Sequence, residues 1–120
     1  AWAYDLPTSQ FDQKAYFTIE RAAIEKVFGE PIKRFKPSAA AIHPLTGDLY
    51  IVSSINKLMV IMNNNTKAII SVISLDKSLF KQPEGIAFNS VGDLVISNEA
   101  AGEGAANLLL FRILEHSRLQ

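Results

Sequence analysis

The side chains of this chain that could do chemistry are oxygen donors. Glu84 precedes a short apolar run, and Asn98 and Glu99 close the next run along the chain. If the two runs are neighbouring antiparallel strands, the start of the first and the end of the second lie at the same edge. Two carboxylates and an amide oxygen would then form a set of hard ligands of the kind that Ca²⁺ prefers. These three residues are the candidate metal site, with calcium as the candidate cofactor; the alternative is an exposed turn residue and the start of a loop.

We expect no catalytic residue. The sequence contains no Cys, which excludes thiol nucleophiles, disulfides and thiolate metal sites. His43 has no Ser or acid at the spacing of a catalytic triad, and His116 lies in a polar tail. The loop at residues 100–106 is rich in Gly and Ala, but it lacks the glycine spacing and the following helix of a phosphate-binding loop.

The composition is typical of a globular protein with no affinity for nucleic acids. The 120 residues include 12 Lys and Arg against 12 Asp and Glu, and 48% of them are hydrophobic. Nucleic-acid-binding domains concentrate a basic excess that this chain lacks. No apolar run approaches the ~18 residues that a transmembrane helix needs. The chain begins at Ala1 without a signal-peptide pattern, so we expect either a removed leader or a piece of a longer protein.

One short helix is expected near residues 20–28. Apolar residues recur there at helical spacing, and Gly29 suits the position that ends a helix. Pro31 prevents the helix from continuing, and a basic linker follows to residue 36.

From Pro37 onward the pattern predicts strands and turns that repeat. Pro37 returns as Pro83 at an offset of 46 residues, and the Gly47-Asp48-Leu49 turn returns as Gly92-Asp93-Leu94 at an offset of 45. The predicted strands of the first copy are residues 39–42, 49–53, 57–62 and 67–75, and those of the second are residues 85–88, 94–98 and 107–113. A repeat of this length made of four short strands is typical of a β-propeller blade.

We therefore predict a mainly all-β fold, a partial β-propeller built from blades of four antiparallel strands. The predicted organisation is the end of a preceding blade at 1–19, the helix and linker at 20–36, a complete blade at 37–75, an incomplete last blade at 83–113 and a tail at 114–120. Closed propellers need about four blades or more, so the chain is too short to close a ring. A self-contained β-sandwich is the alternative fold.

The two copies of the repeat, with the helix before them, resemble a known family. Residues 35–50, followed by 82–88 and 94–99, resemble the C-terminal part of the SdiA-regulated family and, more loosely, NHL-repeat and gluconolactonase-like propellers. The resemblance extends from about Tyr4 to Ile113. It implies a six-bladed propeller of the bacterial cell envelope (periplasm or outer surface) without an established activity, and gluconolactonase-like relatives hold a metal near the candidate site.

Two functions remain open from the sequence. The first is a non-catalytic binding or scaffold module, whose partners are the remaining blades or further copies of the chain, joined through exposed apolar sheet faces. The second is a calcium-dependent hydrolase or lactonase, in which Glu84 and Asn98 hold a Lewis-acid cation.

Overall fold

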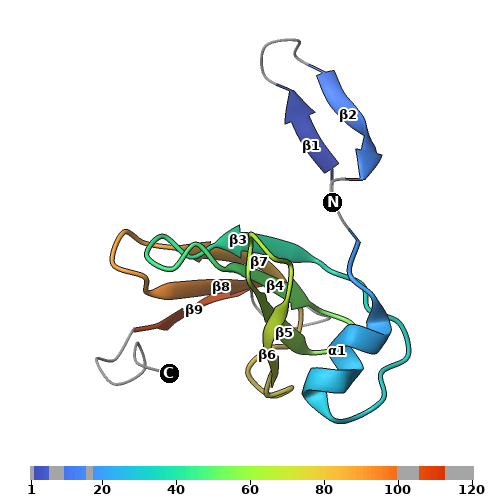
Figure 1. Cartoon of the computed structure of the whole chain (residues 1–120). Helices are drawn as coiled ribbons and strands as arrows, with labels where there is room; N and C mark the ends of the chain where they lie inside the picture. The colour runs from blue at the N-terminus through green and yellow to red at the C-terminus, as the bar shows by residue number, and fades with distance from the viewer. Residues whose placement is uncertain (1, 6–9, 16–17, 100–105, 113–120) are drawn as a thin grey trace.

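The computed structural model describes residues 2–5, 10–15, 18–99 and 106–112, which form antiparallel strands and one helix (Figure 1). In chain order the elements are β1 (Trp2–Asp5), β2 (Gln10–Ala15), α1 (Arg21–Phe28), β3 (Ala39–Ile42), β4 (Leu49–Ser53), β5 (Leu58–Met62), β6 (Ile69–Ser74), β7 (Pro83–Phe88), β8 (Leu94–Asn98) and β9 (Asn107–Phe111). The prediction of a mainly β fold with one short helix is confirmed. The helix is far too short to cross a membrane, and the described residues contain no other helix that could.

The strands form three antiparallel sheets. β1 and β2 make a hairpin, β3 to β6 make a four-stranded sheet, and β7 to β9 make a three-stranded sheet. Each sheet is a simple meander, because strands that follow one another in the chain are neighbours in the sheet. The hairpin falls within residues 1–19, where the end of a preceding blade is predicted, and Figure 1 draws it apart from the two larger sheets.

The two larger sheets repeat the same register. Matched pairs are Ala39–Val52 with Gly85–Ser97, Ile42–Leu49 with Phe88–Leu94, and Ser53–Leu58 with Asn98–Asn107. Each first-to-second-strand turn also contains a glycine with positive φ, Gly47 at 76° and Gly92 at 91°. The repeat seen in the sequence is therefore a repeat of strand pairing, position by position. The sheets differ at their outer edges, because β9 has no described fourth strand beside it as β5 has β6.

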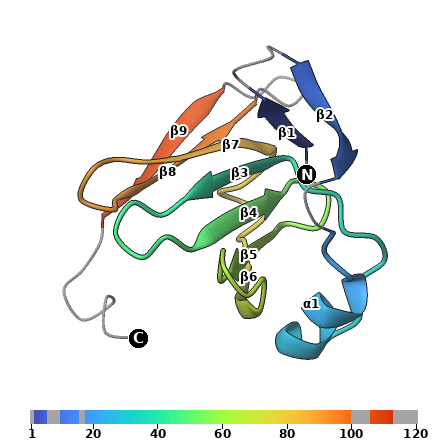
Figure 2. The ribbon, with the colours of Figure 1, turned by 45° about the horizontal axis from the view of Figure 1, so that its top comes forward.

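The two larger sheets pack face to face through one apolar cluster. The buried members of this first cluster are Val52, Met59, Leu75, Phe80 and Ile96. Figure 2 shows β3 and β7 side by side where the sheets meet. At that line the Ser38 hydroxyl donates to the Pro83 carbonyl at 2.8 Å, and the Ser54 N–H donates to the Ser38 Oγ at 3.2 Å. One serine therefore joins both sheets at their closest strands.

Helix α1 covers the other face of the four-stranded sheet. Ile24 is fully buried and forms a second cluster with Ile51 and Val60. The helix ends at Gly29, whose φ is 84° and whose N–H donates to the Glu25 carbonyl at 2.8 Å. The Glu25 carboxylate accepts a hydrogen bond from the Ile32 N–H at 2.7 Å, and this bond holds the linker that follows the helix close to it. Successive side chains of β4 point to opposite faces of the sheet, so Ile51 packs in the second cluster beneath the helix and Val52 in the first cluster between the sheets.

The outer face of the three-stranded sheet, which points away from the four-stranded one, has no covering element among the described residues. Leu108 is 71% exposed and Leu110 is 55% exposed on this face, beside the exposed Ala87 and the half-buried Val95. We call these four residues the open face. Apolar side chains at alternate positions of two neighbouring strands normally lie against another layer of structure.

Candidate functional site

The predicted metal residues lie at one edge of the three-stranded sheet. Pro83 pairs with Asn98, so the start of β7 and the end of β8 are neighbours, as the sequence suggested. Glu84 occupies an irregularity in the register between Pro83 and Gly85 and is half-buried. Glu99 is exposed, and its N–H donates to the Gln82 carbonyl at 2.9 Å. The three residues are therefore close along the backbone of two adjacent strands.

The Asn98 side chain is the buried part of this edge, at 4% exposure. Its Nδ2 donates to the Leu79 carbonyl at 3.2 Å and to the Asn107 Oδ1 at 2.9 Å. Both partner atoms are acceptors, so the Asn98 amide is oriented with its nitrogen towards them and its oxygen away from them. This buried Oδ1 has no hydrogen-bond partner. A buried acceptor without a donor lowers the stability of the folded protein, unless a bound ligand satisfies it.

The described residues place no acidic cluster beside that oxygen. Within the described ranges, no three His, Asp or Glu side chains gather closely enough to hold a metal ion. A calcium ion at this edge would have to rely on Glu84, Glu99 and the free amide oxygen of Asn98, together with backbone carbonyls or water. The metal site at Glu84, Asn98 and Glu99 stays a prediction.

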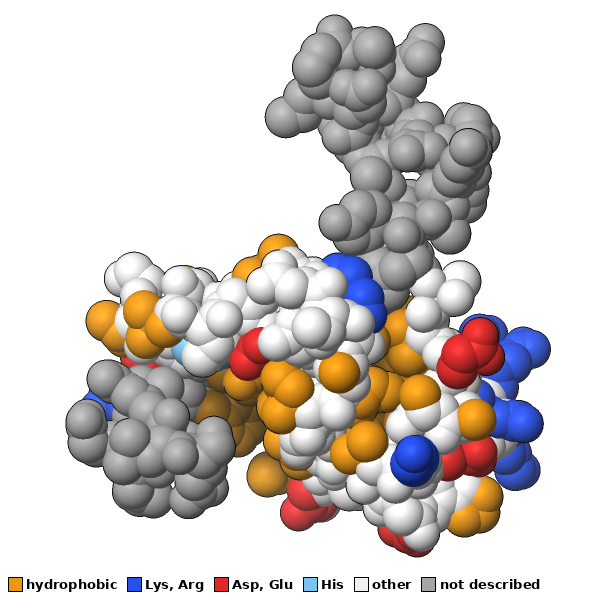
Figure 3. Space-filling view, viewed as in Figure 1, with side chains coloured by type: hydrophobic (Ala, Val, Ile, Leu, Met, Phe, Trp, Pro, Cys, Tyr) orange, Lys and Arg blue, Asp and Glu red, His pale blue; other side chains and the backbone are white. Residues whose placement is uncertain are grey.

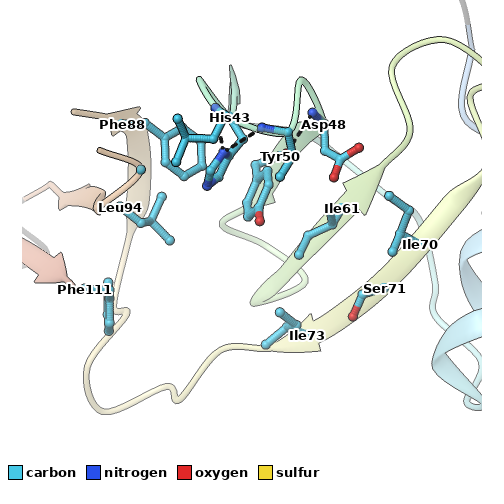
Figure 4. A pocket seen from close by; sticks show the side chains of 13 residues that line it. His43, Asp48, Tyr50, Ile61, Ile70, Ser71, Ile73, Phe88, Leu94 and Phe111 are labelled. Carbon is cyan, nitrogen blue, oxygen red and sulfur yellow. Dashed lines mark hydrogen bonds between the residues drawn. The ribbon is translucent and has the colours of Figure 1, made fainter. Parts of the chain in front are cut away.

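A cavity of about 630 Å³ lies between the two larger sheets, away from the predicted metal residues (Figure 4). Its walls are mostly apolar, with Ile61, Ile70 and Ile73 on the four-stranded sheet and Phe88 and Phe111 on the three-stranded one. Figure 3 shows hydrophobic side chains gathered where Figure 1 places β5 and β6. The cavity is lined by residues of six strands and two turns, and no local pattern in the sequence predicts it.

His43 closes one end of the cavity and is held by its own turn. The backbone N–H groups of Leu45 and Thr46 donate to its Nδ1 at 3.1 and 3.3 Å. The ring is 6% exposed and lies against Phe88 and Tyr50, with centroids 4.8 and 5.7 Å away. Tyr50 and Phe88 also meet edge to face at 4.9 Å. The imidazole therefore caps a turn and packs between the sheets.

Replacing Gly92 by Ala should destabilise the protein through this ring. A Cβ on Gly92 would lie 2.9 Å from the His43 Cε1. The backbone φ of Gly92 is 91°, a conformation that residues with a side chain rarely adopt. We expect a loss of about 1–3 kcal/mol in the free energy of unfolding, measured by urea denaturation. Gly47→Ala is the matched control, because Gly47 has a φ of 76° but open space around it. Equal losses at the two positions would show that the ring contact contributes nothing.

Tyr50 lies beside Asp48 at the same end of the cavity. Partial burial raises the pKa of the Tyr50 phenol above its ordinary value, and the nearby carboxylate of Asp48 raises this pKa further. The neutral phenol is thus favoured in the folded protein.

Alkaline pH should therefore destabilise the protein through Tyr50. A group whose folded pKa is raised contributes stability below its unfolded pKa, about 10 for tyrosine, and this contribution is lost as pH rises through the folded value. The absorbance change of the ionising phenol, taken as wild type minus Tyr50→Phe, should show a midpoint above that of free tyrosine. Asp48→Asn should lower the midpoint without restoring it fully, because burial is the larger cause. A midpoint at the free-tyrosine value would contradict the partial burial of Tyr50 beside Asp48.

Comparison with known protein families, curated proteins and solved structures finds no match for this chain.

Proposed function

We propose that this chain is a non-catalytic scaffold module, a portion of a β-propeller whose four-stranded sheets stack face to face. The observation that carries the proposal is the matched register of the two larger sheets, together with the open face that the second sheet presents. A twisted sheet with apolar residues on both faces is stable when each face lies against another layer.

The repeat indicates what belongs on the open face. Through the matched pairings, Leu108 and Leu110 occupy the positions of Met59 and Ile61. In the four-stranded sheet these positions already face another sheet: Met59 belongs to the first cluster and Ile61 lines the cavity. The open face of the three-stranded sheet therefore corresponds to the face of the four-stranded sheet that already packs against another sheet.

The resemblance to the SdiA-regulated family extends this proposal. It would make the chain the last part of a six-bladed propeller in the cell envelope of a bacterium. Helix α1 lies on the face of the four-stranded sheet where a preceding blade would pack, so the resemblance does not explain the position of the helix.

Copies of the isolated chain should associate through the open face. Because α1 covers the other face of the four-stranded sheet, the open face is the one apolar sheet face left uncovered among residues 18–99 and 106–112. Two copies that join through a single like surface form a closed dimer, whereas two free faces would give an open chain of molecules.

Sedimentation velocity over a range of concentrations tests the proposal. We expect a monomer–dimer equilibrium that Leu108→Lys with Leu110→Lys weakens at least about tenfold, because burying each leucine contributes about 1.5–3 kcal/mol. Ile55→Lys is the matched control, since Ile55 is 69% exposed in a turn outside the open face. A wild-type chain that stays monomeric at all concentrations would contradict the proposal, as would equal effects of the two changes.

A calcium-dependent hydrolase or lactonase is the second candidate, favoured by the unpartnered Oδ1 of Asn98 beside Glu84 and Glu99. If Ca²⁺ binds there, millimolar CaCl₂ should raise the melting temperature, and Glu84→Ala should abolish the rise. Glu30→Ala, at an exposed position outside the sheets, should leave it unchanged. No shift with Ca²⁺ would remove the support for this candidate.

A further inference from the structure

Three oxygen-bearing side chains of the four-stranded sheet line one side of the cavity between the sheets. Asp48 and Tyr50 are two residues apart at the start of β4 and therefore lie on the same face. Tyr50 pairs with Ile61, and Ile61 pairs with Ser71, so Tyr50 and Ser71 flank Ile61 across the sheet. Figure 4 shows the Asp48 carboxylate and the Tyr50 phenol pointing toward the same open space, with Ser71 across from them.

These three side chains have unused capacity for hydrogen bonds and one unbalanced charge. No described residue forms a hydrogen bond or an ion pair with the side chain of Asp48, Tyr50 or Ser71. Asp48 is half-buried and is the one acidic residue of the described cavity walls, which contain no Lys or Arg. The Nδ1 of His43 accepts two backbone N–H groups, so this nitrogen carries no proton. The described walls therefore hold no cation that balances the Asp48 carboxylate.

The rest of the cavity suits an apolar molecule of small size. Ile61, Ile70 and Ile73 form one wall, and Phe88 and Leu94 lie on the other. The volume of about 630 Å³ falls within the range of ~300–1,000 Å³ typical of small-molecule sites, which combine apolar walls with a few polar groups. Three oxygen acceptors on one side match the three N–H donors of a protonated primary amine.

We infer that this cavity binds a small primary amine with an apolar aliphatic or aromatic body, whose ammonium group donates hydrogen bonds to Asp48, Tyr50 and Ser71. The ammonium balances the half-buried carboxylate through a charge-assisted hydrogen bond. The apolar body covers the isoleucines of β5 and β6, which removes their side chains from water. None of these residues belongs to the open face, so amine binding does not require the dimer.

The probe is phenethylamine, which is protonated at neutral pH, and isothermal titration calorimetry of the full chain measures its binding. We expect saturable binding of one molecule per chain. Phenethyl alcohol has nearly the same shape but no charge, so it should bind at least about tenfold more weakly.

A lysine derivative separates a free amine from a lysine side chain of a protein. The compound Nα-acetyl-lysine N-methylamide carries the same ammonium group on a polar peptide unit, whose amides would have to enter the apolar cavity. We expect it to bind at least about tenfold more weakly than phenethylamine. Equal binding of the two compounds would assign the site to a lysine side chain and overturn the inference.

Variants of the chain place the amine in this cavity. Asp48→Asn removes the charge with little change of shape, and Ile70→Lys brings a cation to a wall position that is 52% exposed. Each should weaken phenethylamine at least about tenfold, and two positions are tested in case one variant does not fold. Glu30→Gln is the matched control, because it removes one negative charge at an exposed position outside the cavity and should leave binding unchanged.

Leu108→Lys, on the open face, should also leave amine binding unchanged while it weakens the dimer. Three results would overturn the inference: no saturable binding of phenethylamine, phenethyl alcohol that binds as tightly as the amine, or equal losses with Asp48→Asn and Glu30→Gln.

Discussion

Replacing Ile96 by Ala is expected to lower the free energy of unfolding by about 2–5 kcal/mol. Ile96 is 1% exposed and belongs to the cluster that joins the two larger sheets, where it packs with Val52, Met59 and Phe80. Removing its outer atoms costs their burial and leaves a cavity, because both sheets are held by backbone pairing and cannot collapse fully into the space. This is a large fraction of the 5–15 kcal/mol that stabilises a typical domain.

Val95→Ala is the control for that change. Val95 is the preceding residue of the same strand, but it points to the open face and is half-buried. We expect a loss well below that of Ile96→Ala in urea denaturation of dilute protein, where the chain is monomeric. Similar losses at the two positions would mean that the sheets do not pack through the face that carries Ile96.

Replacing Ile24 by Ala should cost a comparable amount, about 2–5 kcal/mol, because one side chain holds the helix to the sheet. Ile24 is fully buried, and it is the one buried residue of α1. An eight-residue helix is not stable in water by itself, so α1 depends on this contact for its structure. Far-ultraviolet circular dichroism should therefore show a loss of helical signal at temperatures where the strands persist.

Val27→Ala tests whether the helix face is placed correctly. Val27 lies on the same helix and is 45% exposed. We expect it to lower the free energy of unfolding by less than about 1 kcal/mol. If Val27→Ala were as costly as Ile24→Ala, α1 would be rotated about its axis relative to the face described above.

Much of the fold could be predicted from local patterns in the sequence. The strand at residues 49–53 and its repeat at 94–98 have the predicted bounds, because alternating apolar residues and glycine turns are local signals. The strand expected at residues 67–75 is shorter, at Ile69–Ser74, because Lys67 has a φ of 64° and belongs to the turn. The strand expected to begin at Gly85 begins at Pro83, because an irregularity at Glu84 lets two further residues join the ladder.

The long-range features were beyond the sequence patterns. The spacing predicted a helix at residues 20–28, but nothing local indicated that Ile24 would cover Ile51 and Val60. Local patterns could not predict the cavity, because its walls come from strands far apart in the chain, such as those of Ile73 and Phe111. The available signal was that the second copy of the repeat has one strand fewer than the first among the described residues.

The most direct test of the stacking proposal is thiol labelling at the open face. The chain contains no Cys, so Leu108→Cys introduces a single reactive group there, and Ile55→Cys gives a reference thiol of similar exposure in a turn. As the protein concentration rises, we expect the labelling rate at position 108 to fall severalfold while the rate at position 55 stays constant. Labelling at position 108 that is equally fast at every concentration would contradict the claim that the open face binds a second sheet.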